Sequence, residues 1–259
     1  MCRLVAYLGI EIPLENIVVK PKHSLLEQSQ DAQEAKLAVN GDGFGLAWYD
    51  AGGQMGIYKD VLPAWSDANL ASICKMVRSG RFIAHVRAST SGATSRENCH
   101  PFGYENWSFA HNGGIGNFDL IRRKVEGLLS DAHYAARRGN TDSELFFLLM
   151  LTNGLAQDVA GAVEKTTQQM DALLRENQAY SAPIRLTAVF SDGDNIYGFR
   201  HASDDKNPSL YLSECLDHGG RALASEPLHG SGEKWTCVAP GQLVQLSESG
   251  VEIKALRLG

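Results

Sequence analysis

The sequence lacks every cysteine pattern that would indicate a disulfide framework or a zinc knuckle. Its five cysteines are odd in number and scattered, and no C-x-x-C pair occurs. They are Cys2, Cys74, Cys99, Cys215 and Cys237. This usage fits a reducing, cytoplasmic environment. Around His100 there is also no second histidine or carboxylate at ligand spacing, so we expect neither a metal ion nor another cofactor.

Long apolar runs and an excess of positive charge are missing as well. The apolar stretch from Cys2 to Ile10 is too short to cross a membrane and lacks the flanks of a signal peptide. The net charge of −6 disfavours nucleic acid and anionic membranes as partners. With 44% hydrophobic and 21% charged residues, the composition is that of a globular protein. No internal repeat, linker or low-complexity tract occurs, and we expect one domain over residues 1–259.

Short apolar segments bounded by turn residues predict strands near both ends of the chain. The first, Arg3 to Leu8, is expected to be buried and to end at Gly9. Asn40 to Tyr49 is expected to be a glycine-rich turn that leads into a strand. The other expected strands cover residues 55–59, 81–87, 107–111, 184–190, 195–199, 209–212, 221–225, 243–246 and 251–256.

The middle of the chain carries helical patterns instead. Ser66 and Asn117 are each expected to cap a helix. Thr141 to Glu144 fits a T-x-x-E capping box, and the helix behind it is apolar on every side and should be buried. A more polar helix is expected over 159–177. Helices between strand-rich ends predict an α+β fold with antiparallel sheets rather than alternating βαβ units.

The residue after the initiator methionine is a cysteine. Methionine aminopeptidases tolerate such a small side chain, so we expect Met1 to be removed, leaving Cys2 with a thiol and a free α-amine. An α-amine titrates at about 7.7–8.0 and can act as a base near neutral pH. A thiol is a strong nucleophile once deprotonated. Cys2 is thus a candidate nucleophile with its own base, although taken alone it also fits an ordinary small residue starting a strand.

Two motifs in the first half of the chain add candidate binding residues. Arg87 closes a strand, with Thr90 in the following turn, and its guanidinium can form two parallel hydrogen bonds to a carboxylate. A surface salt bridge is the alternative role for this arginine. In Asn98-Cys99-His100-Pro101, His100 can supply a polar group, although the motif also suits a plain loop.

Three later motifs complete the set. In H-N-G-G, the Asn112 side-chain amide and the Gly113 N–H can both donate to one oxygen, as a tetrahedral oxyanion requires; a hairpin turn is the alternative. Asp142, at the N-terminus of a helix, can bind an ammonium group or simply cap the helix. Ser225 and Glu226 end a late strand and are expected to support the site.

The order of these motifs carries more information than any one of them. After the N-terminal cysteine the chain reads H-x-R, N-x-H-P, H-N-G, T-D-S-E and A-S-E-P. This order resembles the class II glutamine amidotransferase domain of the N-terminal-nucleophile hydrolase superfamily, over nearly the whole chain. The resemblance implies a four-layer αββα sandwich of two antiparallel sheets, which the strand and helix pattern permits.

The resemblance also implies a role for each candidate. Cys2 would be the nucleophile, with its own α-amine as base, and Asn112 and Gly113 would form the oxyanion hole. Arg87 would hold the α-carboxylate of a glutamine or γ-glutamyl group, and Asp142 its α-ammonium. Substrate-pocket residues of the family fall at Thr90 and His100. The chain departs from the family at Ala88, where an aromatic residue is common, and at Ser91-Gly92, where a His-Gly pair is common.

A narrower resemblance concerns the substrate. M-C-R-x-x-x-Y-L-G, P-K-H-S-L-L-E-Q-S and N-G-D-G-F-G-L are similar to the ergothioneine-pathway amidohydrolases, which remove glutamate from a γ-glutamyl-cysteine conjugate of trimethylhistidine. The resemblance implies an amidohydrolase acting on a small-molecule γ-glutamyl amide or glutamine through a thioester. Two alternatives stay open: a glutaminase subunit that donates ammonia to a partner synthase, and a non-catalytic binding module on the same fold.

Overall fold

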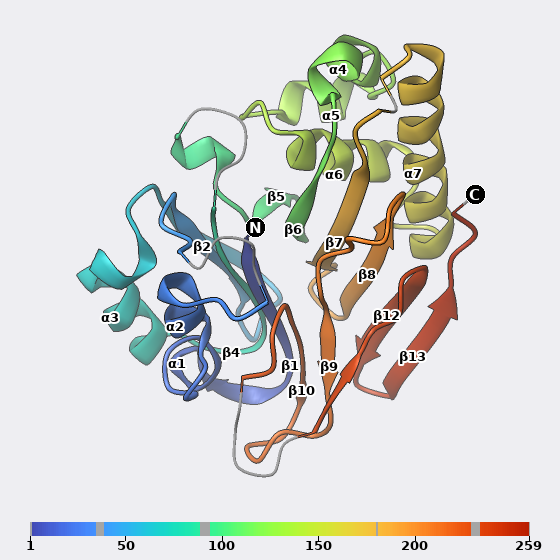
Figure 1. Cartoon of the computed structure of the whole chain (residues 1–259). Coiled ribbons are helices and arrows are strands. Elements are labelled where there is room, and N and C mark those ends of the chain that lie inside the picture. The colour runs from blue at the N-terminus through green and yellow to red at the C-terminus, as the bar shows by residue number, and fades with distance from the viewer. Residues whose placement is uncertain (1, 35–38, 89–93, 180, 229–233, 259) are drawn as a thin grey trace.

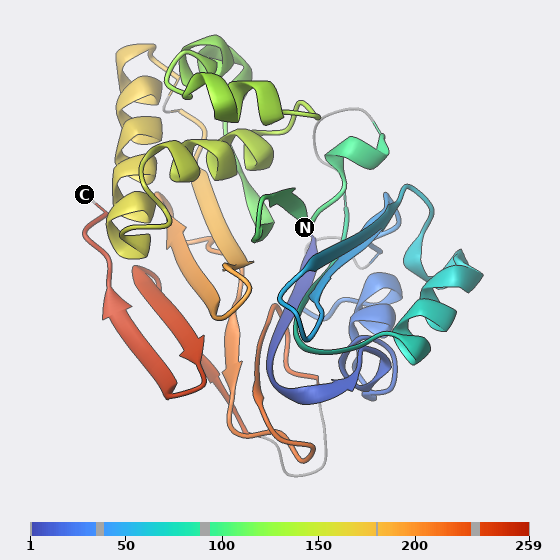
Figure 2. The ribbon, with the colours of Figure 1, turned by 180° about the vertical axis from the view of Figure 1, so that it is seen from behind.

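Two antiparallel sheets lie face to face between two layers of helices (Figures 1 and 2). The structure is a computed structural model that describes residues 2–34, 39–88, 94–179, 181–228 and 234–258. The expected four-layer αββα arrangement is therefore confirmed. None of the helices within the described ranges is long and apolar enough to span a membrane.

The first sheet contains both the beginning of the chain and part of its last third. In spatial order its strands are β11 (Trp235–Cys237), β9 (Tyr211–Ser213), β10 (Arg221–Ala224), β1 (Arg3–Pro13), β4 (Arg78–Val86), β2 (Phe44–Tyr49) and β3 (Met55–Asp60). The N-terminal strand β1 is central, paired with β10 on one side and β4 on the other. The first residues of the chain are thereby held by hydrogen bonds on both sides.

The second sheet is formed by the middle and the end of the chain. Its order is β13 (Gly250–Ala255), β12 (Gln242–Ser247), β8 (Ile196–Ala202), β7 (Ile184–Ser191), β6 (Trp107–Ile115) and β5 (Phe102–Tyr104). Figures 1 and 2 agree in placing the beginning of β1 beside β5 and β6. The first described residues of the chain therefore lie next to the second sheet.

The helices cover the outer faces of the sheets. On the first sheet lie α1 (Glu15–Val18), α2 (Leu25–Gln30) and α3 (Ala68–Met76), with the short 3₁₀ turn η1 (Ala64–Ser66). A second 3₁₀ turn, η2 (Arg96–Asn98), lies between β4 and β5 in the chain. On the second lie α4 (Phe118–Glu126), α5 (Asp131–Ala136), α6 (Asp142–Thr152) and α7 (Val159–Glu176). Helix α6 is buried along most of its length, as its all-apolar sequence predicts.

Side-chain alternation along the strands creates three apolar cores. In β1, Val5 and Tyr7 pack under the helices, whereas Leu4 and Ala6 pack between the two sheets. A third core joins the second sheet to α4–α7. Neighbouring side chains of a strand point to opposite faces, and both faces of β1 are covered by apolar cores. Consecutive residues from Leu4 to Leu8 are therefore all apolar or aromatic.

The sequence-based prediction was wrong at the H-N-G-G motif. Strand β6 does not break at Asn112 but continues to Ile115, in register with β7, where Asn112 faces Thr187. Gly113 keeps the strand going with φ +147°, and a Cβ there would meet the Arg185 carbonyl oxygen at 2.0 Å. The motif is therefore not a hairpin turn, and only glycine fits its centre.

Several helix predictions also need correction. Asp67, not Ser66, caps α3, because its carboxylate accepts from the N–H groups of Asn69 and Leu70. Asn117 precedes α4 in a left-handed conformation, but its side chain donates to the Ala179 carbonyl instead of capping. Beyond these, β1 runs past Gly9, and four short elements were missed: α1, α5, β5 and β11.

Half of the expected capping box at α6 is present. The Thr141 hydroxyl accepts from the N–H of Glu144 at 3.1 Å. The Glu144 carboxylate does not return to Thr141; it accepts from the N–H groups of Arg138 and Gly139 at 2.8 and 2.7 Å. Glu144 therefore shapes the loop before α6, and this loop is joined to Asn98 through Asn140.

Candidate active site

The site lies where the space between the two sheets changes from apolar to polar. Leu4, Ile83 and Ala110 belong to the apolar core between the sheets. Residues two or four positions away on one strand share its face. At one end of the three strands this rule places four polar side chains on the inner faces: Cys2, His85, Arg87 and Asn112. Leu4 pairs with His85 in the β1–β4 register, which sets Cys2 beside Arg87.

A hydrogen bond between the sheets links the elements of this site. His85 Nε2 lies 3.2 Å from the carbonyl oxygen of His111, on β6. A carbonyl can only accept, so Nε2 carries the proton. Burial lowers the pKa of His85 to about 3, so the ring is neutral and its Nδ1 is an acceptor. Cys2 is two residues from the partner of His85, and Asn112 is next to His111, so both lie close to this bond.

Cys2 itself is held at the end of β1. Its Sγ donates to the carbonyl oxygen of Ala88 at 3.6 Å. Burial raises the pKa of the Cys2 thiol, and nearby positive charges, including Arg87 and Arg3, only partly oppose this effect. At neutral pH the thiol is therefore protonated and needs a base to become a nucleophile.

Asn112 is fully buried, yet within the described ranges neither Nδ2 nor Oδ1 has a hydrogen-bond partner. A buried amide without partners costs on the order of 1–3 kcal/mol. Native structures keep few such groups, and a catalytic role is one of the reasons for which they are kept. The Asn112 amide is thus a donor that the described residues do not use, and Gly113 lies directly beside it.

His100 is the second polar side chain without a partner. It is 5% exposed, and no residue of the described part of the chain bonds to either ring nitrogen. Its ring lies 4.3 Å from that of His85 and 4.6 Å from that of Phe102, between centroids. Burial holds the pKa of His100 well below its usual range, so it is a neutral donor and acceptor. The backbone of His100 fits only because Gly45 has no side chain: a Cβ there would meet its carbonyl oxygen at 2.2 Å.

Asp142 reaches the same end of the sheets from the first turn of α6. Its Oδ2 accepts from the N–H of Ile115 at 2.8 Å, and Oδ1 accepts from the N–H of Ser143 at 2.8 Å. A Cβ on Gly114 would lie 3.6 Å from Oδ2, so this carboxylate sits over the inner face of β6, two residues beyond Asn112. It is fixed in place and is not a mere helix cap.

Arg87 is 3% exposed and is therefore not a surface salt-bridge residue. Its backbone N–H donates to Gly43, its carbonyl accepts from Asp42, and Nη1 donates to the Asp42 carbonyl at 3.4 Å. The glycine-rich turn before β2 thus orients the arginine.

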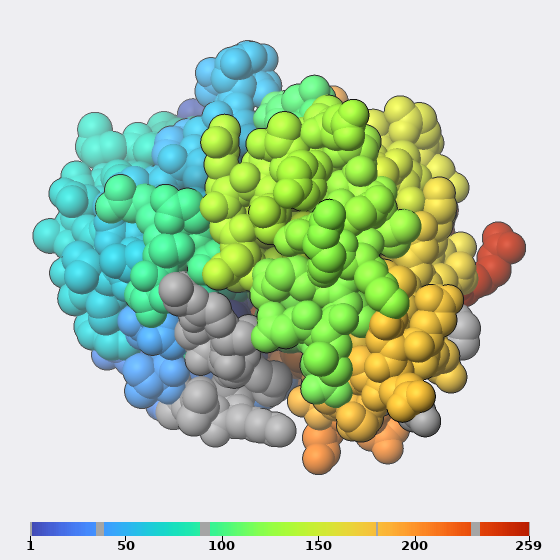
Figure 3. Space-filling model, turned by 90° about the horizontal axis from the view of Figure 1, so that it is seen from above, coloured from blue at the N-terminus to red at the C-terminus, as the bar shows by residue number. Residues whose placement is uncertain are grey.

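Thr90 lies outside the described residues. Seen from above, the described residues just before β5 lie next to the loop after α5 (Figure 3), and Asn98 bonds to Asn140 there.

Sequence reasoning missed how Arg3 takes part. It is fully buried beneath the helices, and Nη1 forms an ion pair of 3.1 Å with Glu226. Ser225, beside Glu226, accepts from the N–H of Leu4 at 3.0 Å and donates its own N–H to the Leu4 carbonyl. The expectation that the A-S-E-P motif supports the site remains a proposal, but its contacts fall on the two residues after Cys2. The sequence does show one sign of this role, because Arg3 is a charged residue in the otherwise apolar segment from Cys2 to Leu8.

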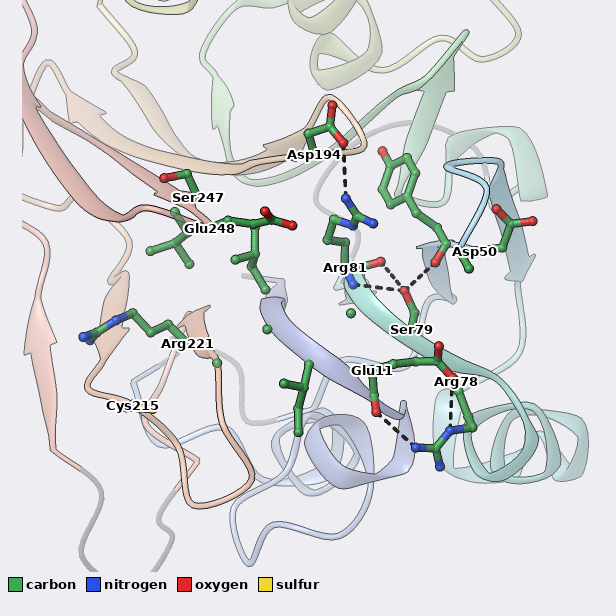
Figure 4. Close-up of a pocket in the computed structure, with 18 of the residues that line it drawn as sticks. Glu11, Asp50, Arg78, Ser79, Arg81, Asp194, Cys215, Arg221, Ser247 and Glu248 are labelled. Carbon is green, nitrogen blue, oxygen red and sulfur yellow. Dashed lines mark hydrogen bonds and ion pairs between the residues drawn. The ribbon is translucent and has the colours of Figure 1, made fainter.

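A wide cavity lies elsewhere in the molecule. It has a volume of about 620 Å³ and is lined by residues that include Glu11, Arg81 and Asp194 (Figure 4). Leu8, which also lines it, is six residues along β1 from Cys2, on the order of 20 Å. Its charged groups largely satisfy one another, through the pairs Arg78–Glu11 and Arg81–Asp194, each at 3.2 Å. None of its described residues has a buried polar side-chain atom without a partner. Chemistry, not volume, therefore identifies the Cys2 end as the site.

Known proteins share both the sequence pattern and the fold. The chain matches the family of class II glutamine amidotransferases over residues 15–216, a segment that starts after Cys2. A probable glutamine amidotransferase, DUG3, of Saccharomyces cerevisiae is 30% identical over 293 residues, covering 96% of this chain and 82% of the yeast protein. The γ-glutamyl-hercynylcysteine sulfoxide hydrolase of Mycolicibacterium smegmatis is 29% identical over 258 residues, covering 99% of this chain and 100% of that protein.

Solved structures agree. A glutamine aminotransferase class-II domain protein from Silicibacter pomeroyi has a TM-score of 0.78 at 34% identity, with 98% of this chain and 99% of that chain covered. The phosphoribosylpyrophosphate amidotransferase of Bacillus subtilis has a TM-score of 0.71 at 16% identity, which shows the fold alone, and only 50% of that chain is covered. The relatives are named as hydrolases and amidotransferases, so the alternative of a non-catalytic module is set aside. The chain is an amide-cleaving enzyme that belongs to the class II glutamine amidotransferase family.

Proposed function

We propose that this enzyme cleaves a γ-glutamyl amide or glutamine, with Cys2 as nucleophile and the Cys2 α-amine as base after removal of Met1. The amine takes the thiol proton, and Sγ bonds to the carbonyl carbon. The carbonyl oxygen becomes an oxyanion between Asn112 Nδ2 and the N–H of Gly113. The proton then passes to the leaving nitrogen, the C–N bond breaks, and a thioester remains. Water hydrolyses the thioester to glutamate and restores the thiol.

The observation that carries this proposal is the buried Asn112 amide without a partner, next to the strand contact that also positions Cys2. An oxyanion would give that amide the acceptor it lacks in the described chain. The protonated thiol supports the same mechanism, because the nearby histidines His85 and His100 are neutral with strongly lowered pKa values. Weak bases of this kind are poor acceptors for a thiol proton, whereas an α-amine is well matched to it.

Two charges of opposite sign favour a substrate with an amino-acid head. Arg87 would pair with the α-carboxylate, and Asp142 would accept from the α-ammonium. Arg87 follows β4 of the first sheet, whereas Asp142 begins helix α6 on the second sheet, so the distance between the two charged groups is set by how these layers pack. Thr90 and His100 complete the proposed pocket, and His100 brings a neutral ring that can bond to the amide being cleaved.

The proposal also concerns the leaving group, which is the amine released when the amide bond is cleaved. One relative is named for a γ-glutamyl-hercynylcysteine sulfoxide, and another as a glutamine amidotransferase. We infer a γ-glutamyl amide of a larger amine as the substrate class. A panel of γ-glutamyl amides and glutamine, read by glutamate release, separates this function from a glutaminase that donates ammonia to a partner synthase.

The nucleophile is tested by Cys2→Ala, Cys2→Ser and a Cys215→Ser control on the exposed far side of the molecule. We expect Cys2→Ala to abolish glutamate release with the fold intact by circular dichroism, and Cys2→Ser to leave a small remainder. Cys215→Ser should turn over like the wild type. An N-terminal tag, confirmed uncleaved by intact mass, should also inactivate the enzyme; full activity of either the tagged protein or Cys2→Ala would rule out the mechanism.

A further inference from the structure

A buried charge cluster lies directly behind the Cys2 residue, on the side of the first sheet that faces the helices. Its centre is the carboxylate of Glu226, which is 1% exposed. Oε1 accepts from Arg3 Nη1 at 3.1 Å and from the N–H of Glu34 at 2.9 Å. Oε2 lies 2.6 Å from His23 Nε2 and accepts from the N–H of Gln33 at 3.1 Å. One side chain thus collects four contacts from three separate parts of the chain.

The cluster is placed to control the N-terminus. Arg3 follows Cys2 directly, and 223 residues of sequence separate it from its partner Glu226. Ser225 adds a side-chain bond to the N–H of Leu4. Residues 3 and 4 are therefore both held by the end of β10, so the position of the Cys2 backbone depends on these contacts.

The charges of Arg3 and Glu226 are buried, so water does not screen them. Arg3 is fully buried, and within the described ranges Nε and Nη2 have no hydrogen-bond partner, so Glu226 is its one close carboxylate. Burial lowers the pKa of Arg3, and the charges of Glu226 and, more weakly, Glu34 oppose that effect. In a medium that screens poorly, removing either member of the pair leaves the other charge exposed to its neighbours.

We propose that Glu226 is a positioning residue for the reaction: it holds Arg3, and the balance of these two charges sets the proton affinity of the Cys2 α-amine. This inference rests on the function proposed above. Among the described residues, the charged and titratable groups around the amine are Arg3 on β1, Arg87 after β4 and Glu226 after β10, with His23 and Glu34 flanking α2 behind them. Among the described residues, the Arg3–Glu226 pair lies on the helix side of the first sheet, away from the proposed substrate pocket.

Substitution of Arg3 and substitution of Glu226 should shift the pH dependence of kcat/KM in opposite directions, because the two residues carry opposite charges. Glu226→Gln leaves Arg3 without a counter-charge, which disfavours the ammonium form of Cys2, so the acid limb of kcat/KM against pH should move to lower pH. Arg3→Met leaves Glu226 in excess, so the limb should move to higher pH. At an effective dielectric constant of about 20, a unit charge on the order of 10–15 Å away predicts shifts of about 1 pH unit.

The assay is release of p-nitroaniline from γ-glutamyl-p-nitroanilide between pH 5 and 9. KM should change little, because the cluster does not face the proposed substrate pocket. The double variant Arg3→Met/Glu226→Gln should return the limb towards the wild-type position. Glu11→Gln is the matched control: it removes a carboxylate from an exposed ion pair at the other end of the same strand and should leave the profile unchanged.

Shifts of opposite sign support the proposal, whereas an unmoved limb, or shifts in the same direction, overturns it. A merely structural cluster would lower activity in both variants without moving the limb. If Glu226→Gln does not fold, Arg3→Met carries the test alone through the upward shift. Failure here is separate from failure of the proposed function, because Cys2→Ala must be inactive whether or not the limb moves.

Discussion

The Asn112 amide leads to a prediction in which stability and activity move apart. Leucine has the same branched shape as asparagine and no polar atoms, so Asn112→Leu replaces the buried amide without leaving a hole. The folded enzyme loses no hydrogen bond, because Asn112 makes none with the described residues. Removal of an unsatisfied buried amide should raise the free energy of unfolding by about 1–3 kcal/mol. The methyl groups of leucine fit the site more tightly and offset part of this gain, so we expect unchanged or higher stability.

Catalysis should respond in the opposite direction. Loss of one oxyanion donor typically lowers kcat by roughly 10²–10³, or about 2.7–4 kcal/mol of transition-state stabilisation. The measurements are kcat for a γ-glutamyl amide and thermal unfolding, where about 1 kcal/mol shifts the Tm of a chain this size by roughly 2–4 °C. A Tm several degrees lower would mean that the amide stabilises the fold. Near-wild-type kcat would mean that it does not serve the oxyanion, and either result refutes the reasoning.

Two further predictions follow from other groups of the site. Arg87→Ala should lower kcat/KM for γ-glutamyl amides about 10–150-fold, the worth of a charge-assisted pair, mainly through KM, with only partial rescue by lysine. Steady-state kinetics with 4-aminobutyryl amides, which lack the α-carboxylate, provide the control: they should be poor substrates and insensitive to the variant, and equal turnover of both substrates would contradict the role of Arg87. The second concerns pH: because burial lowers the pKa of His85 to about 3, the unfolded chain binds a proton between that pH and about 6.5 that the folded chain does not. This contribution to stability is complete above about pH 6.5 and falls by about 1.4 kcal/mol per pH unit below it; urea unfolding of His85→Phe from pH 7 to 5 should show a shallower slope, and an unchanged slope would argue against a neutral His85.

The order of motifs in the chain was enough to determine the family and the fold class. The apolar alternation of β1, the all-apolar helix α6 and most strands were predicted because local side-chain pattern reflects which faces are buried. Cys2, Asn112 and Asp142 stood out for the same reason: each is a polar or reactive residue at the end of a predicted element. Such signals are local and can be read without knowing what packs against them.

What surrounds these residues was decided by tertiary structure. Whether Asn112-Gly113 ends a strand or continues it depends on β7, whose Arg185 carbonyl leaves room only for glycine. The ion pair of Arg3 with Glu226 joins residues 223 positions apart, and no local pattern encodes such a meeting. Sequence therefore determined which chemical groups the enzyme carries. The packing of two sheets determined their burial, and burial sets whether an amide lacks a partner, a histidine is neutral or a carboxylate must be paired.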